Sequence, residues 1–467
     1  MVKKGQTLEL EIESAAFEGS SVARHEGMVI FVRNGVPGDR IRGLVIRKKK
    51  RHAEAVVEEV LEPSQQRTDP LCGHFGVCGG CTWQNYDYQG QLDSKRRQVG
   101  DLLQRIGRLS DLEVRPTLAS PDIYYYRNKM EFSFGNARWL TREEIESGED
   151  FDRDFALGLH IPKRFDRILD LHECHLQSET SAAIVNFVRQ FARRRRWSAY
   201  DTRNHAGFLR NLVIREGKRS GQRLVNLVTK RSEPERMEEI CQALLERFPD
   251  QVSTFVNSVN ETRSPVASGD ETVYHGEGSI QERIGGHTFR IAPTTFFQPN
   301  SLQAEQLFGV ARQMADLKGD EKVFDVYCGV GAVSLFLSDS AAHITGFDLH
   351  RRAIEDAARN ALDNGVKNCR FLAMDAVEAL QPGVTRQLGL PALVVLDPPR
   401  TGLHKDVAKA LLESNVPRIV YISCNPATQA RDLQILSQRY TIEAVQPVDM
   451  FPHTYHIENV VALQLSA

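Results

Sequence analysis

Val394-Val-Leu-Asp397-Pro-Pro-Arg400 and Ile419-Val-Tyr-Ile-Ser-Cys424-Asn-Pro426 are two short apolar runs that each end in a polar or reactive group. Runs of this kind are typical of strands that are buried on both faces of a parallel sheet. Because neighbouring parallel strands end at the same edge, we expect Asp397 and Cys424 to lie close together. Open α/β sheets bind their ligands at that edge. The two stretches therefore predict a functional site that contains a carboxylate and a thiol.

Length and composition indicate a multidomain protein. The chain has 467 residues, 41% of them hydrophobic, which suffices for about three domains at roughly 150 residues each. The formal net charge is -2, but cations cluster in Arg47–Arg51 and Arg193–Arg196. Each run is either a phosphate-binding patch or a solvated face. The start lacks an apolar signal region and no stretch reaches the roughly 18 apolar residues of a membrane span, so we expect a cytoplasmic protein without a membrane partner.

The hydrophobic pattern predicts a multidomain α/β chain in three parts. Residues 1–62 alternate apolar and polar positions between Gly-rich turns, which predicts an OB-like β-barrel. Such barrels often bind RNA, and a barrel without a ligand is the alternative. Residues 63–290 predict a central α+β domain, with part of residues 91–120 packing on the domain that follows. Residues 291–467 predict a doubly wound, Rossmann-like domain.

Cysteine spacing indicates a metal or cluster site in the central domain. Three thiols fall within ten residues in Cys72-x5-Cys78-Gly-Gly-Cys81, where the glycines allow the sulfurs to approach one centre. Cys174 is the best remaining donor in this part of the chain, and four thiolates suit an iron–sulfur cluster. Zinc remains open, because the last two thiols form the pair that zinc sites use and His172 and His175 are rival ligands.

Aromatic and cationic residues alternate in Tyr124–Phe132. Such interleaving suits stacking on unpaired bases while phosphates are neutralised. Arg127, Lys129 and Phe132 are therefore candidate RNA contacts. An edge strand with ordinary tyrosine packing is the alternative.

A Gly turn connects a strand pattern to a helical pattern in Asp325-Val-Tyr-Cys-Gly329-Val-Gly331. The glycines let the backbone approach a ligand, and the amino end of the helix favours electronegative groups. A dinucleotide-binding fingerprint would need glycine where the chain has Ser334. An acid that opens the motif is typical of S-adenosylmethionine (SAM) sites rather than NAD sites. The following strand patterns end at Asp348 and Asp375, and seven strands in all fit the SAM-dependent methyltransferase fold, whose last strands form an antiparallel hairpin.

Cys424 and Glu458 suit the methylation of a weak carbon nucleophile such as uracil C5. A thiolate that adds to C6 activates C5, and a base must then remove the C5 proton so that the thiol can leave. Cys424 offers the thiol, and a helix expected to begin near Pro426 should lower its pKa. Glu458, at the start of the last strand on the same edge, offers the base. A buried structural cysteine is the alternative.

Four motifs together resemble the RNA uracil-5-methyltransferase family. They are Asp397-Pro-Pro-Arg-Thr-Gly-Leu403, Ser423-Cys-Asn-Pro426, His456-Ile-Glu458 and Phe296-Phe-Gln-Pro-Asn300. The similarity extends over nearly the whole chain, with a TRAM domain, a cluster domain and a catalytic domain in the family's order. The chain is most similar to the branch that modifies 23S ribosomal RNA and carries a four-iron, four-sulfur ([4Fe-4S]) cluster.

The resemblance implies roles for individual residues. Cys424 would be the nucleophile, Glu458 the proton-abstracting base, and Phe296 a stacking partner for a flipped-out nucleotide. With the Gly turn and the acids at the strand ends, the expected SAM-site residues are Gln298, Tyr327, Gly329, Gly331, Asp348, Asp375 and Asp397. The expected cluster ligands are Cys72, Cys78, Cys81 and Cys174. The chain departs from the family at Asp348, where glutamate is common, and at Ala332, where many relatives have asparagine.

The implied activity is SAM-dependent methylation of C5 of a specific uridine, with 23S rRNA as the expected substrate and tRNA as the alternative. We expect a monomer with no obligate protein partner. A non-catalytic iron–sulfur RNA-binding protein is the alternative of another class. Amino-group methyltransferases also use Asp-Pro-Pro, but they prefer an aromatic residue where Arg400 stands and need no thiol. Cytosine C5 enzymes use a thiol in different surroundings.

Overall fold

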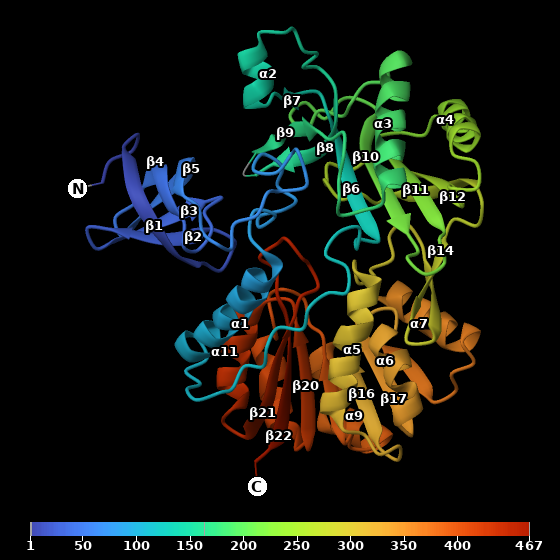
Figure 1. Cartoon of the computed structure of the whole chain (residues 1–467). Helices are drawn as coiled ribbons and strands as arrows, with labels where there is room; N and C mark the ends of the chain where they lie inside the picture. Colours follow the sequence, from blue (N-terminus) through green and yellow to red (C-terminus); the bar gives the residue numbers. More distant parts are fainter. Residues whose placement is uncertain (1, 163, 467) are drawn as a thin grey trace. The chain divides into compact units, whose positions relative to one another are not determined.

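The computed structural model describes residues 2–162 and 164–466, and their contacts divide the chain into two compact units (Figure 1). The first unit comprises Met1–Pro70, Thr82–Ile123 and Gln303–Ala467. The second unit comprises Leu71–Cys81 and Tyr124–Leu302. The chain therefore passes between the units four times, and sequence neighbours such as Cys81 and Thr82 belong to different units.

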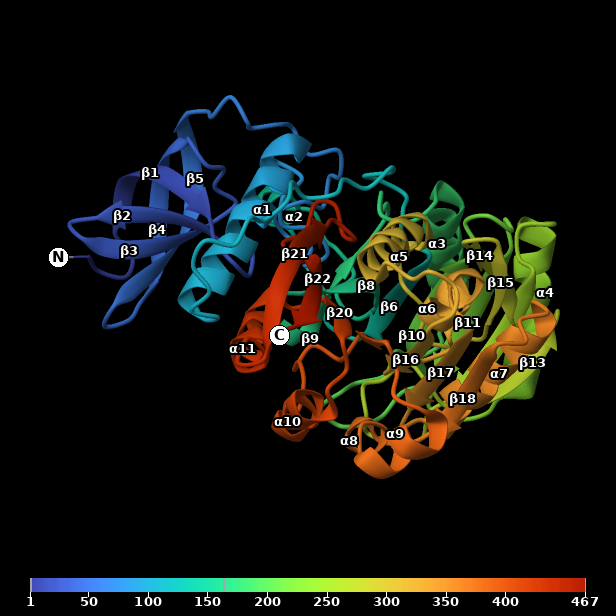
Figure 2. The ribbon, with the colours of Figure 1, turned by 90° about the horizontal axis from the view of Figure 1, so that it is seen from below.

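The first unit begins with a closed barrel in the strand order β1-β2-β3-β5-β4 (Figure 2). Its strands are β1 (Thr7–Ala15), β2 (Ser21–His25), β3 (Met28–Arg33), β4 (Arg40–Lys48) and β5 (His52–Glu62). Alternate residues of β1 are buried, and Leu8, Leu10 and Ile12 join the barrel core. This period of two is what a strand with one buried face requires. The expected closed barrel at the N-terminus is confirmed.

Helix α1 (Tyr88–Arg105) packs on the C-terminal sheet domain. The Asp87 side chain accepts a hydrogen bond from the Gly90 N–H and starts the helix. Val99 and Leu103 on its buried face share a core with residues of α11 (Pro426–Leu436), which lies alongside α1 in Figure 1. The following segment pairs with β21 (Tyr440–Val448) at positions 114 and 118. The contacts thus group residues 82–123 with the C-terminal sheet, which differs from a central domain that begins at residue 63.

The C-terminal sheet of the first unit has the strand order β18-β17-β16-β19-β20-β22-β21. Its other strands are β16 (Lys322–Val326), β17 (His343–Asp348), β18 (Cys369–Ala373), β19 (Leu393–Leu396), β20 (Arg418–Ser423) and β22 (Glu458–Leu465). The first five strands along the chain pair in parallel, and β22 pairs antiparallel with both β20 and β21. The order reverses beside β16, and open sheets bind ligands at such a switch point.

Short helices connect these strands. They are α5 (Ser301–Ala315), α6 (Ala332–Leu337), α7 (Arg351–Asp363), α8 (Ala376–Ala379), α9 (Pro382–Leu388) and α10 (Lys405–Ser414), with a 3-10 turn at Ser338–Ser340. All four residues of β19 are buried, because helices cover both faces of a parallel sheet. This explains why the stretch before Asp397 is a continuous apolar run. The expected doubly wound sheet with a terminal antiparallel hairpin is confirmed.

The second unit is built on an eight-stranded sheet in the order β13-β12-β11-β10-β6-β8-β9-β7. Its strands are β6 (Lys129–Gly135), β7 (Arg138–Trp139), β8 (Ala156–Ile161), β9 (Arg164–Asp170), β10 (Leu209–Glu216), β11 (Arg223–Thr229), β12 (Thr254–Val259) and β13 (Asp270–His275). A hairpin, β14 (Ile280–Ile284) and β15 (His287–Ile291), and helices α2 (Arg142–Ser147), α3 (Glu179–Arg194) and α4 (Pro234–Arg247) complete the unit. The Arg215 guanidinium donates to the carbonyls of Pro293 and Thr295, which holds the segment after β15 in this unit rather than in a domain that begins at residue 291.

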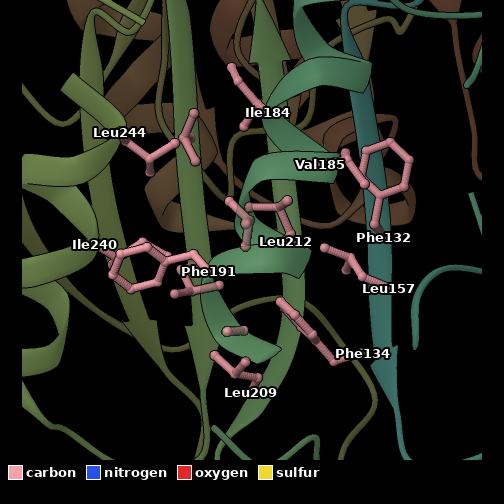
Figure 3. Close-up of a cluster of buried hydrophobic side chains, with 14 of the residues drawn as sticks. Phe132, Phe134, Leu157, Ile184, Val185, Phe191, Leu209, Leu212, Ile240 and Leu244 are labelled. Carbon is pink, nitrogen blue, oxygen red and sulfur yellow. The ribbon is translucent and has the colours of Figure 1, made fainter. Parts of the chain in front are cut away.

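Side chains from α3 and α4 pack on this sheet and form its core (Figure 3). Ile184, Val185 and Phe191 of α3 meet Phe132 and other apolar residues of the strands. Phe132 is only 2% exposed, because β6 lies between β10 and β8 and its inward face is covered by α3. A base cannot stack on this ring while the core stays packed. The prediction of Phe132 as an RNA contact is therefore wrong, and β6 is a central strand rather than an edge strand.

Candidate active site

The ends of β19, β20 and β22 bring Asp397, Cys424 and Glu458 to one edge of the C-terminal sheet. Ser423 pairs with Asn459 across the antiparallel β20–β22 ladder, so the next residues, Cys424 and Glu458, face each other. Asp397 follows β19, the parallel neighbour of β20. The electrostatics agree with this placement, since Asp397 and Glu458 each raise the pKa of the Cys424 thiol. The carboxylate and the thiol of the opening stretches do lie at one edge, together with Glu458.

The Cys424 thiol is half-buried, and its surroundings favour the protonated form. Burial and then the Glu458 carboxyl raise its pKa to about 11. Helix α11 does begin at Pro426, where the Asn425 side chain caps the Ala427 N–H at 3.1 Å. The expectation that this helix leaves the thiol with a lowered pKa is nevertheless wrong, because desolvation and two carboxylates outweigh it. Arg400 opposes them through its charge and a hydrogen bond to the sulfur.

Arg400 connects three parts of the site. Its Nη2 atom lies 2.8 Å from His456 Nδ1, and its carbonyl accepts hydrogen bonds from Asn425 Nδ2 at 3.1 Å and from the Thr428 hydroxyl at 3.2 Å. The loop after β19 is therefore tied to the start of α11 and to the segment before β22. His456 was singled out only as part of a motif, and its contact with Arg400 gives it a structural role.

Gly402 and Asp432 fix the shape of the Asp397–Leu403 loop. Gly402 has a positive φ of 75°, and a Cβ atom there would lie 2.5 Å from Asp432 Oδ2. The same oxygen accepts hydrogen bonds from the Leu403 N–H and from the Tyr421 hydroxyl, each at 2.8 Å. Glycine is thus required both by the backbone conformation and by the close approach of a buried carboxylate.

Glu458 is 4% exposed at the start of β22. Burial raises its pKa well above the usual carboxyl value, and the neighbouring Asp397 raises it further, whereas Arg400 lowers it. The strand ends beside it are fixed by Asn459 Nδ2, which donates to Gln429 Oε1 at 2.7 Å, and by Gln429 Nε2, which donates to the Tyr421 carbonyl at 2.9 Å. A carboxyl group with a raised pKa and a fixed backbone is suited to accept a proton.

The Gly turn after β16 presents backbone rather than side chains to the sheet edge. Tyr327, Gly329 and Gly331 all have positive φ, and the Gly329 N–H donates to Asp348 Oδ2 at 3.1 Å. The other Asp348 oxygen accepts from the His350 N–H at 2.8 Å. Asp375 is exposed, and its side chain caps α8 by accepting a hydrogen bond from the Val377 N–H at 2.8 Å. Burial, and then the charge of Asp375, raise the pKa of Tyr327. The turn and its two carboxylates thus line one region.

Asp325 is a further site residue that the sequence marked only as the acid opening the turn. It is buried, and its Oδ2 atom accepts a hydrogen bond from the Ser334 hydroxyl at 2.5 Å. Its Oδ1 atom is buried and has no hydrogen-bond partner within residues 2–162 and 164–466. Burial raises the pKa of Asp325 to about 6. Burial, and then the charge of Asp325, raise the pKa of Asp397 to about 7. An unsatisfied buried acceptor fits a ligand that carries a donor or a positive charge.

Two expected site residues belong to the second unit. Gln298 accepts a hydrogen bond from Asn128 Nδ2 through its carbonyl at 2.7 Å, and Phe296 is 73% exposed. Their roles toward SAM and a flipped nucleotide stay predictions. Lys129 forms an ion pair with Glu131, and Arg127 lies near enough to Cys174 to lower the pKa of that thiol, which burial raises.

The four predicted cluster cysteines lie together in the second unit. The pKa of Cys78 is raised to about 12 by burial and then by the charges of Cys81, Cys174 and Cys72. Backbone N–H groups point at the sulfurs, including that of Gly80 at 3.3 Å from Cys78 Sγ. Of the cysteine, histidine, aspartate and glutamate side chains that the structure describes, no three are arranged to hold a metal ion. The thiols share one neighbourhood without forming a preassembled site.

The rival zinc ligands each have a contact at Nδ1. His172 Nδ1 lies 3.4 Å from the Arg189 guanidinium, and His175 Nδ1 lies 2.9 Å from the Tyr125 hydroxyl. The Gly73 N–H donates to Glu173 Oε1 at 2.7 Å, which ties the cysteine loop to the segment that carries Cys174.

The two basic runs differ in their surroundings. In Arg193–Arg196, Arg193 lies 3.7 Å from both Asp152 and Asp170, and Arg195 pairs with Glu239, so much of this charge is balanced. In Arg47–Arg51, Arg47 pairs with Glu54 at 3.5 Å, and the rest of the run is exposed at the turn between β4 and β5. Every helix among the described residues is too short or too polar to span a membrane.

Comparison with known proteins agrees with the motifs. The family model described as tRNA (Uracil-5-)-methyltransferase matches residues 221–466. Two proteins described as uncharacterized RNA methyltransferases are each 42% identical to the chain, one from Bacteroides thetaiotaomicron over 96% of this chain and 100% of its own length, and one from Porphyromonas gingivalis over 97% and 99%.

A solved structure is similar over the same extent. The Pyrococcus abyssi tRNA (uracil-54, C5)-methyltransferase in complex with S-adenosyl-L-homocysteine is 30% identical, with a TM-score of 0.74 over 97% of this chain and 99% of that chain. The family match covers more than half of the sequence and includes Cys424 and Glu458. The chain belongs to the RNA uracil-5-methyltransferase family.

Proposed function

We propose that this protein methylates C5 of a uridine in RNA with SAM as the methyl donor, through a covalent bond between Cys424 and uracil C6. The observation that carries the proposal is that Cys424 and Glu458 directly adjoin the last residue pair of the β20–β22 ladder, Ser423 and Asn459, and that burial and then the charge of Glu458 raise the pKa of the Cys424 thiol. A thiol and a buried carboxyl at adjacent strand ends are the two groups that this chemistry needs on the protein side. Family membership supports the same assignment.

The residues act in sequence. Cys424 loses its proton to solvent, aided by Arg400, and the thiolate forms a bond to C6 while the C5=C6 electron pair moves toward C5. SAM, when bound, supplies the electrophilic methyl group. Glu458 then takes the C5 proton, the C5–H electron pair restores the C5=C6 bond, and the C6–S bond breaks to release the Cys424 thiolate. The raised pKa of Glu458 favours this proton transfer.

The residues at the Gly turn fit SAM. Asp325 has an unsatisfied buried oxygen among the described atoms, which suits the positively charged amino acid end of the cofactor. Asp348 is held by two backbone N–H groups and suits the ribose hydroxyls. The related Pyrococcus abyssi structure contains S-adenosyl-L-homocysteine, which supports SAM as the donor.

The reaction is tested with RNA that carries tritium at uridine C5. We expect release of tritium that depends on SAM, and a covalent adduct with 5-fluorouridine RNA that disappears in Cys424→Ala. RNA binding without tritium release or adduct would support the non-catalytic RNA-binding alternative. Persistence of the adduct in Cys424→Ala would assign the nucleophile to another residue.

The proposed substrate is 23S rRNA, which rests on the cysteine pattern and its resemblance to the ribosomal branch. A tRNA substrate is the second candidate, because the similar Pyrococcus abyssi protein is described as acting on tRNA uracil-54. Mapping of 5-methyluridine in ribosomal and transfer RNA from a deletion strain separates the two. Loss of the modification from tRNA alone would overturn the ribosomal assignment.

We also propose that Cys72, Cys78, Cys81 and Cys174 hold a [4Fe-4S] cluster with a structural role. The mutual charge effects of the thiols and the N–H groups that face them support this donor set. Anaerobic purification should give a brown protein with iron and sulfide in equal amounts, and Cys174→Ala should lose both. A colourless protein that contains zinc would contradict the proposal.

A further inference from the structure

The segment Asp449–Ile457 leads from β21 to Glu458 and carries His456. It has no regular secondary structure, and His453 within it has a positive φ of 63°. An irregular segment depends on side-chain contacts for its position, because no ladder of backbone hydrogen bonds fixes it. Several of the contacts that hold it come from α1, which lies outside the sheet that carries the proposed reacting groups.

Gln91 of α1 binds the middle of this segment through its amide oxygen. Its Oε1 atom accepts a hydrogen bond from the His453 N–H at 2.9 Å. Its Nε2 atom donates to the carbonyls of Trp83 at 3.0 Å and Tyr86 at 2.7 Å, and lies 3.2 Å from His453 Nδ1. The His453 carbonyl in turn accepts from the N–H groups of Thr82 at 2.9 Å and Trp83 at 3.0 Å. Gln91 is fully buried, so these bonds are made without competition from bulk water.

Lys95, one helical turn further along α1, binds the start of the segment. Its Nζ atom donates to Asp449 Oδ1 at 2.6 Å and to the Phe451 carbonyl at 3.3 Å, and both charged side chains are fully buried. Asp449 Oδ1 also accepts from the Phe451 N–H at 3.1 Å. A buried ion pair contributes little net stability compared with an apolar pair, but it fixes the geometry of the groups that it joins.

We propose that Gln91 and Lys95 are positioning residues that hold Asp449–Ile457 so that the Glu458 carboxyl stays aligned for proton removal from C5. The inference rests on the proposed function of Glu458. Position matters at this step, since a misplacement of about 1 Å can cost about a hundredfold in rate. The segment also reaches the thiol side through the contact between His456 and Arg400, but the Arg400 backbone is held separately by Asn425 and Thr428.

Loss of the contacts from Gln91 or Lys95 should therefore slow one step of the reaction more than the others. When the segment loosens, proton removal by Glu458 should slow more than addition of Cys424, so that resolution of the methylated adduct becomes the slow step. The covalent protein–RNA species should therefore accumulate with ordinary uridine RNA, which a general loss of stability would not produce.

The test compares Gln91→Leu with Gln98→Leu in the full-length protein. Both glutamines are buried on α1, but Gln98 donates to the Ala15 carbonyl at 3.1 Å and does not bind the segment. In single turnovers with C5-tritiated RNA, Gln91→Leu should release tritium at least about tenfold more slowly and accumulate the adduct on denaturing gels. Gln98→Leu should behave as the wild type. Equal rates in all three proteins, or equal slowing in both variants, would overturn the proposal.

A second variant allows the same test if Gln91→Leu does not fold. Lys95→Met combined with Asp449→Leu removes both charges together and leaves neither buried without a partner. We expect a folded protein with slow tritium release and an accumulated adduct, and release at the wild-type rate by that folded protein would overturn the inference. Wild-type protein that neither releases tritium nor forms the 5-fluorouridine adduct would instead overturn the proposed function itself.

Discussion

At the scale of single residues, the raised pKa of the Cys424 thiol opposes the formation of the thiolate that the proposed reaction needs. A thiol with a pKa of about 11 is almost entirely protonated at neutral pH, and only the thiolate attacks carbon. Burial and two carboxylates cause the shift, while Arg400 works against them. The same arginine also contacts His456, so its charge is held in place beside the sulfur.

Replacement of Arg400 by methionine should raise the pKa of Cys424. At pH values below the pKa, each unit of increase in the pKa lowers the thiolate fraction about tenfold. Adduct formation with 5-fluorouridine RNA at neutral pH should therefore slow by the same factor. The pH–rate profile should shift to higher pH and recover at the alkaline end. Arg400→Lys should retain part of the effect, because it keeps the charge but not the planar fork.

The matched control is Arg386→Met, which removes an exposed arginine on α9 whose guanidinium binds only the Pro382 carbonyl among the bonds assigned to it. Its pH–rate profile should match the wild type. An unshifted profile in Arg400→Met would mean that another group activates the thiol.

At the scale of elements, the Asp397–Leu403 loop depends on glycine at position 402. In Gly402→Ala the new Cβ would clash with Asp432 Oδ2, so the loop must move away from α11 and shift Arg400 and Asp397. Activity should fall strongly while the protein stays folded. Gly365→Ala is the control, since Gly365 has a similar φ of 68° but open space around it. Both variants should lose about 1 kcal/mol of stability from backbone strain, and similar activity in the two would contradict a role for the close approach.

The elements also show what sequence can predict. Apolar runs ending in Asp397 and Cys424 were sufficient to place the two groups at one sheet edge, because buried parallel strands have a distinctive pattern. The burial of Phe132 could not be predicted from the sequence, because alternation shows that one face of a strand is apolar but not which helix covers that face. The pKa of Cys424 was predicted in the wrong direction for a similar reason, because local helix geometry is visible in the sequence and burial by distant segments is not.

Helix α1 illustrates the same limit. It lies at Tyr88–Arg105 and so covers part of the stretch, residues 91–120, that was expected to pack on the C-terminal domain. Its polar buried residues, Gln91 and Lys95, find partners more than three hundred positions away in the sequence. A pattern within the helix cannot indicate such partners. The expectation that part of residues 91–120 packs on the C-terminal domain agrees with the contacts of α1, but the residues that make these contacts could not be predicted.

At the scale of the whole molecule, the net charge of -2 means that RNA must be attracted by local surfaces. The end of β4 and the turn that follows carry Lys48, Lys49, Lys50 and Arg51 in exposed positions, whereas other barrel cations pair with glutamates, such as Arg42 with Glu59. Unbalanced cations at the tip of a barrel suit the phosphate backbone, which binds through the release of counterions. The barrel would then add affinity to a site whose chemistry lies elsewhere in the first unit.

Replacement of Lys48, Lys49 and Lys50 by glutamine should weaken RNA binding and lower its dependence on salt. If all three contact phosphates of single-stranded RNA, the slope of log affinity against log salt should decrease by about 2. The control removes three exposed cations from the C-terminal sheet domain, Lys367→Gln, Arg386→Gln and Lys409→Gln, and so makes the same change in net charge. An equal loss in both triple variants would mean that overall charge, rather than the barrel tip, attracts the RNA. A smaller slope in the first variant alone, with SAM-dependent tritium release intact at saturating RNA, would assign the barrel to binding and leave catalysis to the sheet edge that carries Cys424.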